Sequence, residues 1–248
     1  MDSLDDDFSA FVFKIQANMN KAHRDRIAFM RIVSGRFDAD KEVYHVQGGK
    51  KLRLSRPQQL MAAEREIIEE AYAGDIIGVF DPGIFSIGDT LCAPGKKFRF
   101  DPIPTFAPEH FKRVRSLDTM KRKQFLKGME QIAQEGAIQI FKTPYTGMEE
   151  VIVGVVGTLQ FDVLEYRLKN EYNVELYMEG LPYEYLRWIE TDDGEPVKEE
   201  DLILGTDVKL VEDYKGNQLL LFGSQWAIGW TEERNKNLTF HEFGGTKF

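Results

Sequence analysis

Three prolines within seven residues separate two stretches of this chain that have different hydrophobic patterns. They lie in Asp101-Pro-Ile-Pro-Thr-Phe-Ala-Pro108, and each proline disfavours a helical conformation in the residue before it. Such a segment is typical of an extended linker. The chain has 248 residues, 42% of them hydrophobic, which is enough for two domains with a core each. We therefore predict a domain boundary at residues 102–108.

Residues 8–101 have the pattern of an all-β domain. Short apolar runs, often alternating with polar residues, are separated by turn signals such as Gly48-Gly49 and Asp81-Pro82-Gly83. Regularly spaced short strands of this kind indicate a closed barrel or a sandwich. Residues 63–71 are expected to be helical or irregular instead. The leader 1–7, with four aspartates, is expected to be disordered, as are the last five residues.

Residues 109–248 alternate between strand and helix patterns. The first six elements follow the order β-α-β-β-α-β, which is the ferredoxin-like or split βαβ arrangement. A further strand, a hairpin and a C-terminal helix follow them. The expected ranges are 110–115, 118–135, 137–141, 151–156, 158–172 and 174–178, then 183–190, 207–212 with 218–222, and 224–234.

Helical spacing also predicts which side chains of this second domain are buried. Met120 should face inward from the first helix, and Leu159 from the second. Trp226 and Trp230 lie four residues apart on the last helix. We expect both to pack in the core, because Ala227 and its neighbours make that helix apolar nearly all round. Stacking on bases is the alternative for the two tryptophans.

The net charge of −9 is distributed unevenly. Residues 106–127 carry seven basic and two acidic side chains, a net of +5, whereas residues 128–248 carry ten and 23, a net of −13. An acidic chain is not a general nucleic-acid binder, but this distribution allows one RNA-facing side and one acidic side.

Two basic segments are candidates for RNA contact, since arginine binds phosphate through two parallel hydrogen bonds. One is a loop between two predicted strands, and the other joins a strand to the helix that follows it. The alternatives are a solvated loop, with Arg24 or Arg26 paired to a carboxylate, and an ordinary charged helix face. The candidate contacts are Lys21, His23, Arg24, Arg26, Arg113, Arg115 and Lys123.

The sequence nominates no catalytic, cofactor-binding or metal-binding residue. Gly49-Lys50 is the nearest match to a phosphate-binding loop, but it lacks the upstream glycine and is followed by Lys51 instead of serine or threonine, so a hairpin turn is expected. The histidines have no zinc-site spacing. The single cysteine, Cys92, cannot form an intramolecular disulfide, and no apolar run approaches the ~20 residues of a membrane span. We expect a cytoplasmic chain with no membrane partner.

Several of these segments are similar to the release factor 3 family of translational GTPases, over residues 8–243. The stretch from Phe11 to Arg26 carries the resemblance, and the run through His23-Arg24-Asp25-Arg26 is specific to that family. Tyr72-Ala-Gly-Asp-Ile76 and Gly88-Asp-Thr90 are shared more broadly, for example with elongation factor G. Val153-Gly-Val-Val-Gly-Thr-Leu-Gln-Phe-Asp-Val163 adds to the resemblance.

The resemblance implies an elongation-factor-like β-barrel at 8–101 and a family-specific α/β domain at 109–248. It also implies that the parent protein is a ribosome-dependent GTPase, which removes decoding release factors during translation termination. GTP or GDP and magnesium would bind to a GTP-binding domain that this sequence lacks, so no cofactor and no enzymatic activity are expected here. The implied partners are small-subunit rRNA, ribosomal protein and the family's own GTP-binding domain.

Three other interpretations stay open. The chain could be a fragment of another translational GTPase, such as an elongation factor G relative, which would differ after residue 180. It could be an independent enzyme with a site between its two domains. It could also be a stand-alone RNA-binding module.

Overall fold

A computed structural model describes residues 6–17, 26–39, 41–61, 64–96, 98–101, 103–144 and 150–243. The chain forms two compact units, one comprising Met1–Ile103 with Gln134–Gly136 and the other Pro104–Ala133 with Ala137–Phe248. The change of unit at residues 103 and 104 falls within the proline-rich segment. The expected disorder of residues 1–5 and 244–248 lies outside the described residues. Asp6 and Asp7 are described, and the Asp7 carboxylate lies 2.8 Å from the Lys96 ammonium in a solvent-exposed ion pair.

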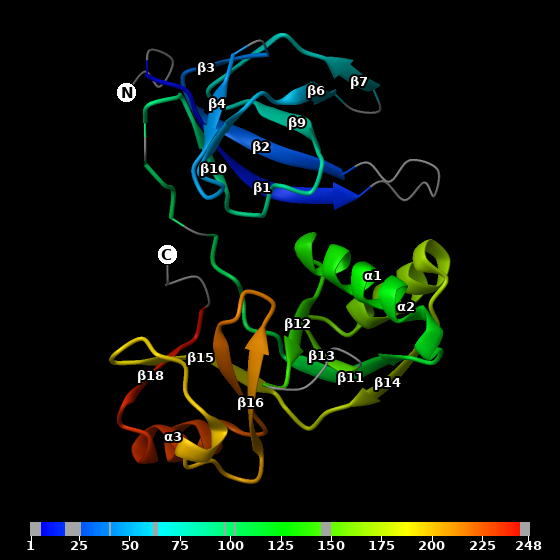
Figure 1. Ribbon diagram of the computed structural model, residues 1–248, viewed down its shortest axis with the longest axis vertical. Coiled ribbons are helices and arrows are strands. Elements are labelled where there is room, and N and C mark those ends of the chain that lie inside the picture. The colour runs from blue at the N-terminus through cyan, green and yellow to red at the C-terminus, as the bar shows by residue number, and fades with distance from the viewer. Residues whose placement is uncertain are drawn as a thin grey trace. The chain divides into compact units, whose positions relative to one another are not determined.

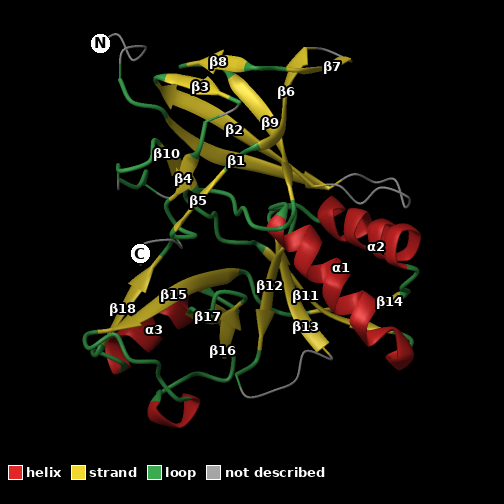
Figure 2. Cartoon of the chain, turned by 45° about the horizontal axis from the view of Figure 1, so that its top comes forward, coloured by secondary structure: helices red, strands yellow, loops and turns green. Residues whose placement is uncertain are grey.

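The first unit is a curled, antiparallel sheet of eight strands in the order β5-β4-β10-β1-β2-β9-β6-β7, with a separate pair formed by β3 and β8 (Figure 1, Figure 2). This arrangement confirms the predicted β-barrel type of fold. The strands are β1 (Ser9–Ala17), β2 (Arg26–Ser34), β3 (Arg36–Asp38), β4 (Val43–His45), β5 (Lys50–Leu52), β6 (Ser55–Met61), β7 (Glu64–Ile67), β8 (Glu70–Tyr72), β9 (Ile76–Asp81) and β10 (Thr90–Cys92).

A β-bulge sets which side chains of β1 enter the core. Ala10 and Val12 are buried, and the register against β2 then shifts between Val12 and Lys14. Because side chains alternate along a strand, the shift brings Ile15, at an odd position, back to the buried face. On its other edge β1 pairs with β10, where Ala10 lies opposite Leu91.

The prediction for residues 63–71 is wrong, since this segment forms β7 and β8. The alanines and glutamates there favour a helix, but intrinsic propensity is a weak preference that tertiary contacts override. β7 pairs with β6, and β8 pairs with β3, so the hydrogen bonds of the segment go to strands. Gly49 does lie in the hairpin turn between β4 and β5, as expected.

The second unit contains an eight-stranded sheet in the order β14-β11-β13-β12-β16-β17-β15-β18. Its first four strands have the ferredoxin-like order, with the fourth strand of the motif beside the first and the third beside the second, which confirms the predicted split βαβ arrangement. The elements are β11 (His110–Ser116), α1 (Arg122–Gln134), β12 (Gln139–Lys142), β13 (Glu150–Val155), α2 (Leu159–Tyr172), β14 (Leu176–Gly180), β15 (Tyr185–Thr191), β16 (Val208–Asp213), β17 (Gln218–Phe222), α3 (Gln225–Arg234) and β18 (Leu238–His241).

Helices α1 and α2 cover one face of the ferredoxin-like half of this sheet (Figure 2). Phe125 and Met129 of α1 pack there with Leu164 of α2 and with Val114 of β11. The other face packs against the additional strands in a second cluster. Its members are Phe111, Phe141, Ile152, Leu186, Trp188, Val211, Leu219 and Leu221. Helix α3 packs through Ala227 and Ile228 on β16 and β17.

Three side chains that we expected to be buried are exposed. Met120 (88% exposed) lies in a 3₁₀ turn before α1, whose tighter winding changes the phase of the helical pattern. Leu159 (75%) is two residues from the buried Phe161, and so about 200° from it around the helix. Trp226 (72%) lies on the outer face of α3. Within the part of the chain that the structure describes, no helix is both long enough and apolar enough to cross a membrane.

Candidate nucleic-acid interface

The first basic segment is the connection of a β-hairpin. β1 and β2 are antiparallel neighbours whose last described pair is Ala17 opposite Arg26. The candidates Lys21, His23 and Arg24 belong to the connecting residues 18–25, which lie outside the described residues. Arg26 is the one candidate of this segment whose side chain is described.

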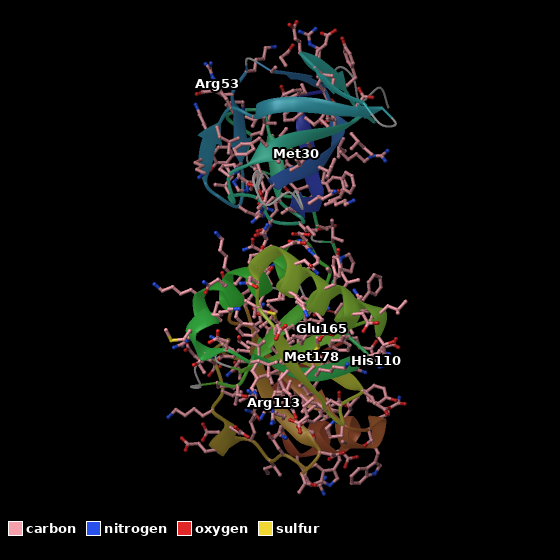
Figure 3. The ribbon with its side chains drawn as sticks, turned by 90° about the vertical axis from the view of Figure 1, so that its right-hand side faces the viewer. Met30, Arg53, His110, Arg113, Glu165 and Met178 are labelled. Atoms are coloured by element: carbon pink, nitrogen blue, oxygen red, sulfur yellow. The ribbon has the colours of Figure 1, made fainter. Side chains whose placement is uncertain are left out.

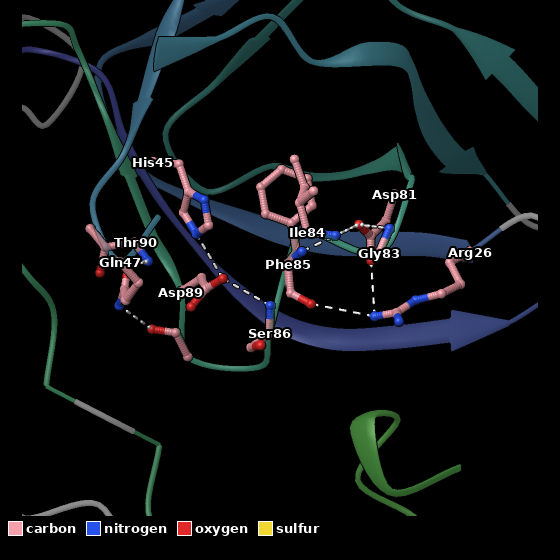
Figure 4. A network of polar contacts seen from close by, with 11 residues as sticks. Arg26, His45, Gln47, Asp81, Gly83, Ile84, Phe85, Ser86, Asp89 and Thr90 are labelled. Atoms are coloured by element: carbon pink, nitrogen blue, oxygen red, sulfur yellow. Dashed lines mark hydrogen bonds and ion pairs between the residues drawn. The ribbon is translucent and has the colours of Figure 1, made fainter. Parts of the chain in front are cut away.

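Arg26 is bound inside the first unit. Its Nη2 lies 3.0 Å from Oδ2 of Asp81, and the Asp81 side chain is fully buried while that of Arg26 is 13% exposed. Nη2 also donates to the carbonyl oxygen of Phe85 at 3.3 Å. Arg26 and Asp81 are register partners on β2 and β9, so strand pairing brings the two charges together. Of the two interpretations of Arg26, the structure therefore supports pairing to a carboxylate (Figure 4).

The Asp81 carboxylate also organises the turn that follows β9. Its Oδ1 accepts hydrogen bonds from the backbone N–H groups of Gly83 and Ile84, each at 2.8 Å, and of Phe85 at 3.3 Å. Gly83 has a φ of +97°, a conformation that side-chain-bearing residues rarely adopt. One buried carboxylate thus fixes both the turn and the base of the β1–β2 connection.

A second buried carboxylate holds the other end of the loop between β9 and β10. Oδ2 of Asp89 lies 2.8 Å from Nε2 of His45 and accepts the N–H of Ser86, also at 2.8 Å. The His45 ring packs edge-on against Phe85, with ring centroids 5.3 Å apart. Gln47 bonds the N–H of Thr90 at 2.8 Å. Figure 4 shows this network. The sequence did not predict it, because the four histidines are scattered and their spacing gives no sign of a common site.

Arg113 and Arg115 lie on the face of β11 that is turned away from α1 and α2. Val114, between them, packs under the helices, and Lys112 lies 4.5 Å from the centre of the Phe161 ring of α2. Since side chains alternate along a strand, Arg113 and Arg115 point to the opposite face. Figure 3 shows Arg113 on this sheet, on the far side from Met178, which packs with the helix-covered core.

On that face the two arginines are held by residues of the edge strand β14. Arg113 Nη1 lies 3.4 Å from a carboxylate oxygen of Glu179, and the Arg115 guanidinium lies 4.6 Å from the centre of the Tyr177 ring. Tyr177 is 45% exposed. Burial raises the pKa of nearby Tyr183, and the positive charge of Arg113 opposes that effect. The arrangement is a guanidinium and aromatic platform, which is suited to phosphate groups and to the faces of bases.

Lys123 does not belong to that platform. It is exposed on α1, on the helix-covered side of the sheet, and Lys127 follows it one turn later. The sheet therefore separates Lys123 from Arg113 and Arg115, and the second basic segment forms two surfaces instead of one. Among the described residues, no group of three histidine, cysteine, aspartate or glutamate side chains is placed to hold a metal ion.

Comparison with known families gives two adjacent matches. The family described as class II release factor RF3, C-terminal domain, matches residues 100–232. Elongation factor G domain 2 matches residues 7–94. The first match covers more than half of the chain, and the two together cover nearly all of it.

Curated relatives match over almost the whole chain. The protein named peptide chain release factor 3 from Symbiobacterium thermophilum is 56% identical over 233 residues, which are 94% of this chain and 43% of the relative. Its namesake from Gloeobacter violaceus is 47% identical, over 96% of this chain and 44% of the relative. The protein of the same name from Listeria monocytogenes is 47% identical, over 93% of this chain and 43% of the relative. The chain thus spans less than half the length of these relatives.

A solved structure supports the fold alone. A crystal structure of a Thermus thermophilus protein superposes on 84% of this chain and 31% of that protein, with a TM-score of 0.55 and 17% sequence identity. At this identity the likeness says nothing about activity.

Proposed function

Because this chain belongs to the peptide chain release factor 3 family, we propose that it is the ribosome-docking part of a release factor that acts in translation termination. The match of residues 100–232 to the C-terminal domain of class II release factor RF3 carries this proposal. The parent protein is a ribosome-dependent GTPase that removes decoding release factors from the ribosome. GTP or GDP and magnesium bind to a GTP-binding domain outside this sequence.

In this proposal the chain performs no chemistry and acts by position. It comprises a barrel domain at 8–101, a linker at 102–108 and an α/β domain at 109–248, and its cytoplasmic partners are small-subunit rRNA, ribosomal protein and the GTP-binding domain. The nucleotide state of that domain moves the docking domains against the ribosome, as in a rigid-body switch. An elongation factor G origin is disfavoured, because the family match after residue 100 is to release factor 3.

Two surfaces are proposed to contact the ribosome. Lys21, His23 and Arg24 contact it from the β1–β2 connection, while Arg26 positions that connection through Asp81 instead of binding RNA itself. The platform of Arg113, Arg115 and Tyr177 forms the second surface, and the stacked guanidinium of Arg115 supports this assignment. Lys123, with Lys127, forms a third and weaker contact from α1.

Charge reversal in the full-length parent protein tests these contacts. We expect Arg113→Glu with Arg115→Glu, and separately Lys21→Glu with Arg24→Glu, to weaken ribosome co-sedimentation and to make it less sensitive to salt. Each lost phosphate contact lowers the slope of log affinity against log salt by ~1. Lys198→Glu with Lys215→Glu is the matched control, since both lysines are exposed in the acidic part of the chain.

If the two charge-reversed proteins bind ribosomes like the control over the whole salt series, the contact assignment is wrong. Tight, strongly salt-dependent binding of the 248-residue chain alone to RNA that is not ribosomal would favour the alternative, a stand-alone RNA-binding module. GTP hydrolysis by the control protein in the presence of ribosomes should be unchanged.

A further inference from the structure

The outer side of α3 carries a row of two tryptophans and an arginine. Trp226 and Trp230 are one turn apart, with ring centroids separated by 6.4 Å and ring planes inclined by 39°. The guanidinium carbon of Arg234 lies 4.0 Å from the centre of the Trp230 ring. Trp226 is 72% exposed, so the outer end of the row is open to solvent. We call Trp226, Gly229, Trp230, Glu233 and Arg234 the tryptophan face.

Packing within the chain does not explain why Trp226 lies on this face. Helix α3 is attached to its own sheet through Ala227, Ile228 and Thr231, which are buried. By helical spacing, positions 226 and 233 lie opposite these residues. Position 230 lies at the flank of the buried stripe, and Trp230 is half-buried there. Single exposed apolar residues are common on protein surfaces, but two neighbouring tryptophans beside an arginine have the composition of an interface hot spot.

Gly229 is a second and independent observation. It lies inside the helix, where glycine is a poorer helix former than alanine. A Cβ at this position would meet nothing within 4 Å, so no contact inside the chain requires the glycine. By helical spacing it lies between Trp226 and Glu233, and it leaves a flat area beside the exposed indole.

The net charge of the C-terminal part of the chain indicates what the tryptophan face binds. Residues 128–248 carry a net charge of −13, which repels nucleic acid. Glu233 lies on the same face and is 75% exposed, at 3.9 Å from Arg234. The face already holds one guanidinium against an indole, and a planar guanidinium stacks on aromatic rings better than an ammonium does.

We propose that the tryptophan face docks an arginine-bearing segment of a partner protein. A partner guanidinium stacks on the open side of Trp226 and extends the ladder that Arg234 begins, while its backbone crosses the flat area at Gly229. Glu233 pairs with a second basic side chain. This proposal goes beyond ribosome docking by the basic surfaces and does not depend on it, because it concerns the acidic half of the chain.

Binding of a short fluorescein-labelled peptide of alternating arginine and glycine to the 248-residue chain tests the proposal. Fluorescence anisotropy is measured near physiological salt, where the Debye length is ~8 Å and distant charges are largely screened. Trp226→Ser should weaken binding roughly three- to thirtyfold, the range expected for a cation–π contact that is partly desolvated. A lysine and glycine peptide should bind more weakly than the arginine peptide.

Two further variants separate recognition from folding and from bulk charge. Gly229→Gln should keep or raise the melting temperature, since glutamine is the better helix former, and yet weaken peptide binding by covering the flat area. Tyr166→Ser is the matched control, because Tyr166 is an exposed aromatic residue (67%) on α2. It should leave peptide binding unchanged.

Equal peptide binding by all four proteins would show attraction by net charge alone and would overturn the proposal, as would a lack of binding by the unmodified chain. The proposal also fails if the chain binds single-stranded poly(U) more tightly than the peptide and the Trp226→Ser variant no longer binds poly(U). It fails too if Trp226→Ser dissociates a dimer of the chain, because the face would then join two copies.

Discussion

Replacing Arg26 with methionine should destabilise the first unit strongly. Arg26 Nη2 lies 3.0 Å from the Asp81 carboxylate, whose side chain is 0% exposed. Methionine keeps the aliphatic length but leaves a buried negative charge without its counterion. Removing one partner of a buried ion pair costs about 3–5 kcal/mol. The three backbone N–H groups that donate to Asp81 still stabilise the ionised form, so we expect a value near ~3 kcal/mol, at the lower end.

Two companion variants test whether the cost comes from the unpaired charge. Asp81→Asn keeps an oxygen that can accept from Gly83, Ile84 and Phe85 and leaves Arg26, which is 13% exposed, partly solvated. It should cost about 1–3 kcal/mol. The double variant should be more stable than the sum of the single effects predicts, by about 0.5–3 kcal/mol. Arg36→Met is the surface control, since its ion pairs are solvent-exposed and worth at most ~1 kcal/mol.

The positions of the tryptophans provide the assay. All three, Trp188, Trp226 and Trp230, lie in the second unit. Tryptophan fluorescence during urea unfolding therefore reports on that unit, while far-UV circular dichroism reports on both. A loss of ~3 kcal/mol in a domain of this size lowers its melting temperature by roughly 12–24 °C. We expect Arg26→Met to move the circular dichroism transition of the first unit and to leave the fluorescence transition in place.

This expectation is refuted if Arg26→Met stays within ~0.5 kcal/mol of the unmodified chain, which is the range of neutral surface changes. It is also refuted if the loss of unfolding free energy in the double variant equals the sum of the losses in Arg26→Met and Asp81→Asn. In either case Asp81 is not held as a charged partner of Arg26.

Two other substitutions test the second unit, one its packing and the other the end of α2. Gly154→Ala should lower the free energy of unfolding by about 1–3 kcal/mol through overpacking, because a Cβ there would lie 2.6 Å from Cγ of Pro108 and 2.9 Å from the Phe141 ring. Urea unfolding followed by tryptophan fluorescence measures this loss. An unchanged unfolding midpoint would contradict it. Asn173→Gly should stabilise the chain by a few tenths of a kcal/mol to ~1 kcal/mol. Asn173 ends α2 with a φ of 56°, a conformation that glycine adopts without steric cost. A lower melting temperature of the variant would show that the Asn173 side chain has another role.

The local pattern of the sequence predicted the order of elements in the second unit. Gly136 (φ +78°) marked the end of the first helix, and the ferredoxin-like arrangement was predicted from the β-α-β-β-α-β order of the elements. Residues 63–71 were predicted wrongly because their partners, β6 and β3, decide their conformation. The ion pair of Arg26 could not be predicted locally, because its partner Asp81 is far away in sequence. The two residues become neighbours only through the β2–β9 register.

The division of the second basic segment could have been predicted from alternation. Lys112 and Val114 form the helix-facing side of β11, so Arg113 and Arg115 had to point away from the helix that carries Lys123. The exposure of Trp226 also had a signal, because Ala227, Ile228 and Thr231 alone define a buried stripe on α3. Helical periodicity predicts which side of a helix is exposed, but it does not identify the partner that binds an exposed tryptophan.

The pairing of β1 with β10 has a consequence for synthesis of the chain. β1 ends at Ala17, but β10 begins at Thr90 and its pairing extends to Cys92. β1 and β2 can form a hairpin early, yet the outer edge of β1 keeps its backbone groups unpaired until β10 has left the ribosome. At ~5–20 residues per second this interval lasts roughly 4–15 s. During that time an open strand edge can recruit other chains, so the first unit is most vulnerable to aggregation before its last strand is made.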